Sequence, residues 1–349
     1  MSITALDFRD IRCLQAVEWK PSPEMNLIVG ANGAGKTSLL EGISLAGTGK
    51  TLRSGRVRAA IAHGREKLSA RLGFGEGLDA GKLCYERGAS EKTWVLDGVP
   101  VKSAAEVYGR LPLMIFSPES HYAMLQDPNA RREVVYWLMF HVEPFFLDAW
   151  RRYQRLLRQR NAALRVRDRN YRAFDPGLIQ LSSVLADMWQ RAAQALEGPF
   201  RDIVHQQRLG GEAATVLRPG WQGESLAAAL ETNRETDERL GYTFAGPHRA
   251  DVAFKLDGRA IQEVASHGQQ KIFMSAWRLA VVMVVVASGK RPILLLDDLA
   301  AELDVERRES FFATLKDVGL QTFVTAIDET SFPAPATVFH VEHGCLRGP

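Results

Sequence analysis

The chain of 349 residues is longer than one average domain of about 150 residues, so we expect two domains. With 46% hydrophobic and 24% charged residues, the composition excludes wholesale disorder. The net charge of +3 is too small to identify a polyanionic partner by itself. The cysteines Cys13, Cys84 and Cys345 lie far apart without a CxxC pair, which supports neither a disulfide framework nor a zinc site and favours a reducing cytoplasm.

The sequence indicates neither a secretion signal nor a membrane-spanning helix. The N-terminal segment MSITALDFRDI carries acids and an arginine and lacks the basic-then-apolar order of a secretion signal. The longest apolar run covers only residues 279–287, whereas a membrane span needs about 20 residues. We expect a cytoplasmic protein with no membrane partner.

The order of predicted elements indicates an α/β fold. Alternating patterns over residues 1–30 predict short strands, the segment after Lys36 predicts a helix, and Gly-rich alternation to about residue 115 predicts a β-rich subregion. Helical spacing then prevails, until RPILLLDD and QTFVTA predict inner strands of a parallel sheet. We predict one domain of residues 1–120 and 242–349 around a central mixed or parallel sheet, with a helical lobe of residues 121–241 inserted into it.

A phosphate-binding loop follows the first apolar strand. The pattern GxxxxGK[ST] is matched at every fixed position, between LIV and the helical SLLEGISLA, by Gly30, Ala31, Asn32, Gly33, Ala34, Gly35, Lys36 and Thr37. Such a loop points backbone N–H groups and a helix N-terminus at phosphate oxygens. Lys36 would hold the β and γ phosphates of ATP and Thr37 would hold Mg²⁺. A chance Gly-rich turn is the alternative, and the flanking strand and helix favour nucleotide binding.

Two carboxylates end the strand ILLL. Asp297 would bind Mg²⁺, and Asp298 stands where a general base would orient water toward the γ-phosphate. Aspartate is one methylene shorter than glutamate, so we expect slow hydrolysis. An acidic pair after a strand is also common in ordinary loops. The following residues 301–304 suit either a helix start with acids at its positive end or, through Asp304, an element at a dimer seam.

The segment 266–271, SHGQQK, precedes the helical run IFMSAWRLAVVMV. Ser266 is predicted to cap this helix and to leave N–H groups open to phosphate. An ordinary capped turn explains the local pattern equally well.

Residues 150–172 form an arginine-rich segment of predicted helix. It carries nine arginines against one acid, Asp168, a local excess of eight positive charges. We select Arg151, Arg155, Arg158 and Arg165 as candidates for sequence-independent contact with double-stranded or single-stranded DNA, because no base-reading motif is visible. The alternative is a surface helix that is merely polar, since arginine is a good helix former.

These motifs in this order resemble the ABC-type ATPases of chromosome maintenance, which include the SMC proteins. The likeness is closer to bacterial recombination mediators of that class and extends over nearly the whole chain. Its further carriers are FSPES at residues 116–120, Asp127-Pro128 through Arg131-Arg132, YQRLLRQRNAA at residues 153–163, and GPHRAD at residues 246–251.

The resemblance implies an ABC-type ATPase head in which Ser266, Gly268 and Gln269 meet the γ-phosphate bound by a partner subunit. ATP would then join a head-to-head homodimer on DNA near single-strand gaps. It also implies partners RecR and RecO in loading the recombinase RecA, release by weak, DNA-stimulated ATP hydrolysis, and a link to replication restart and the SOS response. Thr325 stands where many transport ATPases have a switch histidine, and the glutamine that senses the γ-phosphate is not identified.

Three functions compete on this sequence: a DNA-clamp ATPase of repair, an SMC-like structural organiser of DNA, and a transport-type ABC ATPase. An SMC arm needs hundreds of heptad residues between the ATPase halves, and only about 230 residues intervene here. A transport ATPase would be indifferent to DNA, so DNA-stimulated hydrolysis separates it from the clamp.

Overall fold

The structure is a computed structural model and describes residues 2–53, 57–75, 77, 80–298, 304–329, 332 and 335–348. The chain forms two units. The first joins Met1–Tyr122 to Gly289–Pro349, and the second is Ala123–Ser288. The two termini of the chain therefore belong to the same unit, as expected for a domain that contains an insertion.

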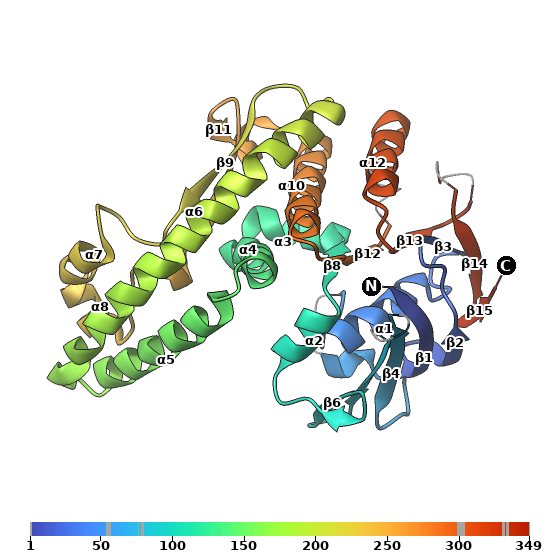
Figure 1. Cartoon of the computed structure of the whole chain (residues 1–349), viewed down its shortest axis with the longest axis horizontal. Coiled ribbons are helices and arrows are strands. Elements are labelled where there is room, and N and C mark those ends of the chain that lie inside the picture. Colours follow the sequence, from blue (N-terminus) through green and yellow to red (C-terminus); the bar gives the residue numbers. More distant parts are fainter. Residues whose placement is uncertain are drawn as a thin grey trace. The chain divides into compact units, whose positions relative to one another are not determined.

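The first unit contains two sheets of six strands (Figure 1). One is antiparallel throughout, in the order β2 (Leu14–Trp19), β1 (Ile3–Ile11), β4 (Leu68–Phe74), β5 (Gly81–Arg87), β6 (Lys92–Leu96), β7 (Val99–Pro100). The other is in the order β15 (Cys345–Arg347), β14 (Thr337–Glu342), β3 (Met25–Val29), β13 (Thr322–Ala326), β12 (Ile293–Leu296), β8 (Leu113–Phe116). Its strands run parallel except β15, so the predicted central mixed sheet and β-rich subregion are confirmed.

Helix α1 (Lys36–Thr48) contacts strands of both sheets. Its Leu39, Leu40 and Ile43 are fully buried in one apolar cluster with side chains of the two sheets. Each such side chain stabilises the fold by about 2 kcal/mol, which fixes the start of α1 relative to the strands. The unit also contains the three-ten helix η1 (Val57–Ala60), α2 (Ala104–Arg110), the first part of α3 (Pro118–Gln126) and α12 (Val305–Val318).

The second unit is mainly helical (Figure 1). Its helices are α4 (Pro128–Val142), α5 (Phe146–Arg165), η3 (Arg169–Phe174), α6 (Asp175–Gln206), α7 (Leu226–Thr232), α8 (Arg234–Leu240), η4 (Pro247–Arg249), α9 (Ile261–Val264) and α10 (His267–Ala287). A sheet of three strands has the order β11 (Arg259–Ala260), β10 (Asp251–Leu256), β9 (Ala213–Arg218). Helices α5 and α6 run alongside each other, and α10 packs on α6 and α4.

The boundary expected at residue 242 does not coincide with the division of the structure. Residues 242–288 belong to the helical unit, because β10 pairs with β9 and its Phe254 contacts α10. The ring of Phe254 lies 5.4 Å from that of Phe273 and 5.1 Å from that of Trp277. Long-range pairing of this kind leaves no local mark in the sequence.

Helix α10 contains the apolar run at residues 279–287. Among the described residues it is the one helix that could cross a membrane by length and composition. Of its most apolar stretch of 18 residues, 67% is buried inside the structure. A core helix passes the same test, and α10 packs as one.

Candidate functional site

The predicted phosphate loop lies between the end of β3 and the start of α1. All five residues of β3 are buried, so the loop leaves the sheet from a fixed point. Gly35 is the N-cap residue of α1 and has φ 119°, a conformation that favours glycine. It offers no side chain to cap the helix, so the first N–H groups of α1 are open to a ligand such as phosphate.

The ammonium group of Lys36 is folded back onto this loop. Its Nζ donates to the carbonyl oxygens of Gly30, at 2.7 Å, and Ala31, at 3.1 Å, and the residue is only 5% exposed. A positive charge is therefore held over the loop.

Thr37 and Asp297 come together across 260 residues of sequence. The Thr37 hydroxyl donates to Asp297 Oδ1 at 3.0 Å, and the Thr325 hydroxyl donates to the same oxygen at 2.9 Å. Burial raises the pKa of Asp297 to about 6; the hydroxyls of Thr325 and Thr37 oppose this shift, and the negative charge of Asp298 adds to it. Within the described part of the chain, the side-chain partners of this carboxylate are two neutral hydroxyls and no cation compensates its charge.

The donor set of Thr37 and Asp297 fits Mg²⁺. This ion binds oxygen ligands and is held by one or two carboxylates together with the phosphates of a substrate. Among the described residues, no group of three or more His, Cys, Asp and Glu side chains could hold a metal ion by itself.

Asp298 follows directly and has a left-handed backbone, with φ 51°. Its N–H donates to Thr325 Oγ1 at 2.9 Å, which holds this conformation. Thr325 thus fixes both acids at the end of β12. Asp298 lines a cavity of about 320 Å³ together with Lys36 and Thr37. Asn32, Gly33 and Gly35 of the phosphate loop line it too, so six of the predicted site residues share one pocket.

The same cavity is lined by two arginines that sequence reasoning missed, Arg12 and Arg53. Arg12 lies in the turn between β1 and β2, and its guanidinium binds both carboxylate oxygens of Glu41, at 2.8 and 3.0 Å. Neither arginine belongs to a local motif: Arg12 lies in a turn of the antiparallel sheet, and Arg53 follows the end of α1. No signal in the sequence distinguishes them from other arginines.

Ser266 caps α10 as predicted, and the helix begins at His267, five residues before the predicted helical run. Ser266 Oγ accepts from the N–H of Gln269 at 3.2 Å, and Gln269 Oε1 accepts from the N–H of Ser266 at 2.9 Å, a reciprocal capping box. Ser266 and Gly268 are exposed. These residues belong to the second unit, whereas the phosphate loop belongs to the first.

Asp304 is the N-cap residue of α12. Its side chain accepts from the N–H of Arg307 at 3.0 Å and pairs with the Arg307 guanidinium at 2.8 Å. The predicted helix start is therefore observed, and the role of Asp304 at a dimer seam stays a prediction. Ala301, Glu302 and Leu303 lie outside the described residues.

The arginine-rich segment is not one continuous helix. Helix α5 ends at Arg165, Arg167 has φ 55°, and η3 begins at Arg169. Arg151, Arg155, Arg158 and Arg165 are all exposed, and their spacing places them on one face of α5. We call these four residues the arginine stripe. From Arg151 to Arg165, a separation of 14 residues, it spans about 21 Å.

Arg160 differs from the arginine stripe, because it is only 1% exposed. Its guanidinium contacts Asp175 and Asp237, each at 2.7 Å. By contrast, within the described part of the chain no ion pair involves Arg155, Arg158 or Arg165. The local excess of positive charge on the surface is thus smaller than the sequence suggests, and it is concentrated on one face.

Comparisons with known proteins agree with this architecture. Residues 2–345 match the family model described as the RecF/RecN/SMC N terminal domain. The chain is 36% identical to the DNA replication and repair protein RecF of Thioalkalivibrio sulfidiphilus, over 99% of each chain. It is also 36% identical to the protein of that name from Escherichia coli O1:K1 / APEC, over 94% of this chain and 93% of the other.

Two solved structures share the fold. The recombination mediator protein RecF-ATP in the RecFOR pathway matches with a TM-score of 0.87 and 20% identity, over 100% of this chain and 97% of that one. An SmcHead bound to the C-winged helix domain of ScpA matches with a TM-score of 0.62 and 15% identity, over 99% of this chain and 96% of the other. Together with the sequence matches, these results show that the chain belongs to the RecF family and has the RecF/SMC-head ATPase fold.

Proposed function

We propose that this chain is an ATP-dependent DNA-binding protein of recombinational repair and replication restart, whose ATP-bound homodimer holds DNA. The observation that carries the proposal is the pocket that Lys36 and Thr37, from the start of α1, line together with Asp298, while Thr37 also donates to Asp297 at the end of β12. The relatives' name, DNA replication and repair protein RecF, supports the process.

In this proposal the triphosphate lies along residues 30–37. Lys36 exchanges its two carbonyl partners for β- and γ-phosphate oxygens, which are stronger acceptors for an ammonium group. Thr37 and Asp297 hold Mg²⁺, which when bound neutralises phosphate charge. Asp298 orients the attacking water, and its short side chain makes weak ATPase activity the expected outcome.

A second copy of the chain completes the pocket in trans. Ser266, Gly268 and Gln269 stand at the N-terminus of the 21-residue helix α10, which is capped by Ser266 and where the helix dipole favours an anion. We propose that they bind the γ-phosphate held by the other subunit, with Asp304 at the seam. The ATPase head would then draw on residues 1–120 and 242–349 even though 242–288 fold with the helical unit.

The arginine stripe is proposed to bind DNA phosphates, in double-stranded and single-stranded DNA alike, without base recognition. The solved RecF-ATP structure is assigned to the RecFOR pathway, which supports RecR and RecO as partners in loading RecA. DNA-stimulated hydrolysis would release the clamp. A cytoplasmic site of action and a part in the SOS response follow from this role.

The test is the mass of the protein in solution, with and without ATP and duplex DNA. Wild type is expected to double its mass with ATP and to retain DNA, and Lys36→Ala is expected to stay monomeric and to lose ATP-dependent retention. Lys20→Ala, an exposed lysine at the end of β2, is the matched control and should behave as wild type. ATP-dependent dimers of Lys36→Ala would refute the assignment.

A further inference from the structure

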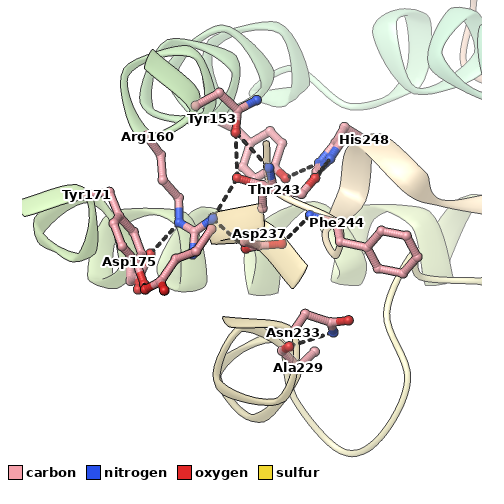
Figure 2. Close-up of polar contacts among 12 residues, drawn as sticks. Tyr153, Arg160, Tyr171, Asp175, Ala229, Asn233, Asp237, Thr243, Phe244 and His248 are labelled. Carbon is pink, nitrogen blue, oxygen red and sulfur yellow. Dashed lines mark hydrogen bonds and ion pairs between the residues drawn. The ribbon is translucent and has the colours of Figure 1, made fainter. Parts of the chain in front are cut away.

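The segment of residues 243–251 connects α8 to β10, and we call it the connecting segment. Its first residue is held by the inner face of α5: Thr243 donates from its N–H and its hydroxyl to Asn161 Oδ1, at 2.8 and 2.7 Å. Arg160 donates to Thr243 Oγ1 at 2.8 Å (Figure 2). Helix α5 therefore carries the arginine stripe on one face and binds the connecting segment through its other face.

A second contact between α5 and the connecting segment joins Tyr153 to His248 (Figure 2). The Tyr153 hydroxyl lies 2.7 Å from His248 Nδ1, and His248 Nε2 lies 3.1 Å from the carbonyl oxygen of Thr243. Because a carbonyl only accepts, Nε2 carries the proton and donates, and Nδ1 accepts from Tyr153. Burial lowers the pKa of His248 to about 4, so this neutral tautomer persists at neutral pH.

Gly246 makes this contact possible. It has φ 146°, and a Cβ atom there would lie 2.4 Å from the Tyr153 hydroxyl oxygen. Only glycine therefore allows the connecting segment to pass so close to α5.

The far end of the connecting segment is fixed to α4. Arg131 binds both carboxylate oxygens of Asp251, at 2.7 and 2.9 Å, and Arg132 donates to the carbonyl oxygen of Ala250 at 2.7 Å. Asp251 is the first residue of β10, whose Phe254 packs against Phe273 of α10. Continuous contacts thus run from α5 through the connecting segment to the helix that Ser266 caps.

We propose that the connecting segment couples DNA at the arginine stripe to the placement of Ser266 and Gln269, with Tyr153 and His248 as positioning residues. The proposal rests on the proposed function. A displacement of α5 by bound phosphates cannot be absorbed in the densely hydrogen-bonded inner face, so it moves the connecting segment and β10 with it. Ser266 and Gln269 then reach the partner's nucleotide in a position that favours hydrolysis.

The test compares Tyr153→Phe with Tyr171→Phe. Each removes one hydroxyl from a buried ring of the helical unit, and the Tyr171 hydroxyl donates to Glu238 at 2.7 Å, away from the connecting segment. We expect Tyr153→Phe to keep basal ATP turnover and duplex affinity but to lose about fivefold of the DNA stimulation, the contribution of one hydrogen bond. Tyr171→Phe should be stimulated as wild type.

Hydrogen exchange gives a second readout. In wild type with ATP, duplex DNA is expected to change exchange at residues 243–251 and at 266–271, and in Tyr153→Phe the change at 266–271 should be lost. Full stimulation of Tyr153→Phe, or equal losses in both variants, would overturn the coupling. A wild type that binds ATP and dimerises without any response to DNA would also overturn it while leaving the nucleotide site intact, and failure to bind ATP would sink the proposed function itself.

Discussion

Two buried charges, one in each unit, are treated in opposite ways. Arg160 in the helical unit has two carboxylates and a hydroxyl within hydrogen-bond distance, and its charge is fully compensated. Asp297 in the first unit is bonded, among the described residues, by two hydroxyl groups, and its pKa is raised. A satisfied buried charge serves the fold, whereas an uncompensated one indicates a place for a cation. By this criterion, Arg160 belongs to a structural network and Asp297 belongs to a binding site.

The largest expected effect that tests this contrast is the loss of Arg160. Arg160→Met removes the cation and leaves Asp237, which is fully buried, without its charged partner. We expect a loss of about 3–5 kcal/mol in the free energy of unfolding, measured by urea denaturation. Arg158→Met, two residues away on the exposed face, should change it by less than about 0.5 kcal/mol. Equal effects of the two changes would contradict a structural role for Arg160.

Replacement of Asp297 should have the opposite effect on stability. Because its pKa in the folded protein, about 6, lies above the ordinary value of 3.8, ionisation costs stability at pH 7, by up to about 3 kcal/mol. Asp297→Asn is expected to raise the unfolding temperature of the nucleotide-free protein and to abolish the added stabilisation by Mg²⁺ with ATP.

The pH supplies the control for this second prediction. Stability that wild type lacks at pH 7 is regained as the pH falls from about 6 to below 4, where the carboxyl is protonated in both the folded and unfolded states. The advantage of Asp297→Asn should therefore vanish near pH 3.5. An advantage that is independent of pH would mean that charge is not its cause.

The smallest effect on stability is expected at the arginine stripe, where a large effect on DNA binding should appear instead. Arg155→Ala with Arg158→Ala should leave unfolding almost unchanged and reduce the slope of log affinity against log salt by roughly 1 to 2. Replacement of Arg167 and Arg169, which lie beyond the end of α5, is the control. An unaltered salt slope would place the DNA surface elsewhere.

The local motifs were determined by the sequence alone. A phosphate loop needs glycines and a lysine at fixed spacing between a strand and a helix, and the capping box needs Ser266 and Gln269 three residues apart, so short-range rules suffice. The α/β fold class, with its mixed sheet and β-rich subregion, followed from hydrophobic periodicity for the same reason.

The tertiary structure alone decided which charged residues are buried and what they meet. Arg160 is chemically identical to the other arginines of its segment. Its contacts with Asp237, 77 residues away, and with Asp175 give it a structural role. Contacts between distant segments likewise decide three further features: the unit boundary after residue 288, the arginines in the nucleotide pocket, and the hydrogen bond between Tyr153 and His248. Local patterns carry no information about such contacts, because their free energy arises only when packing removes the groups from water.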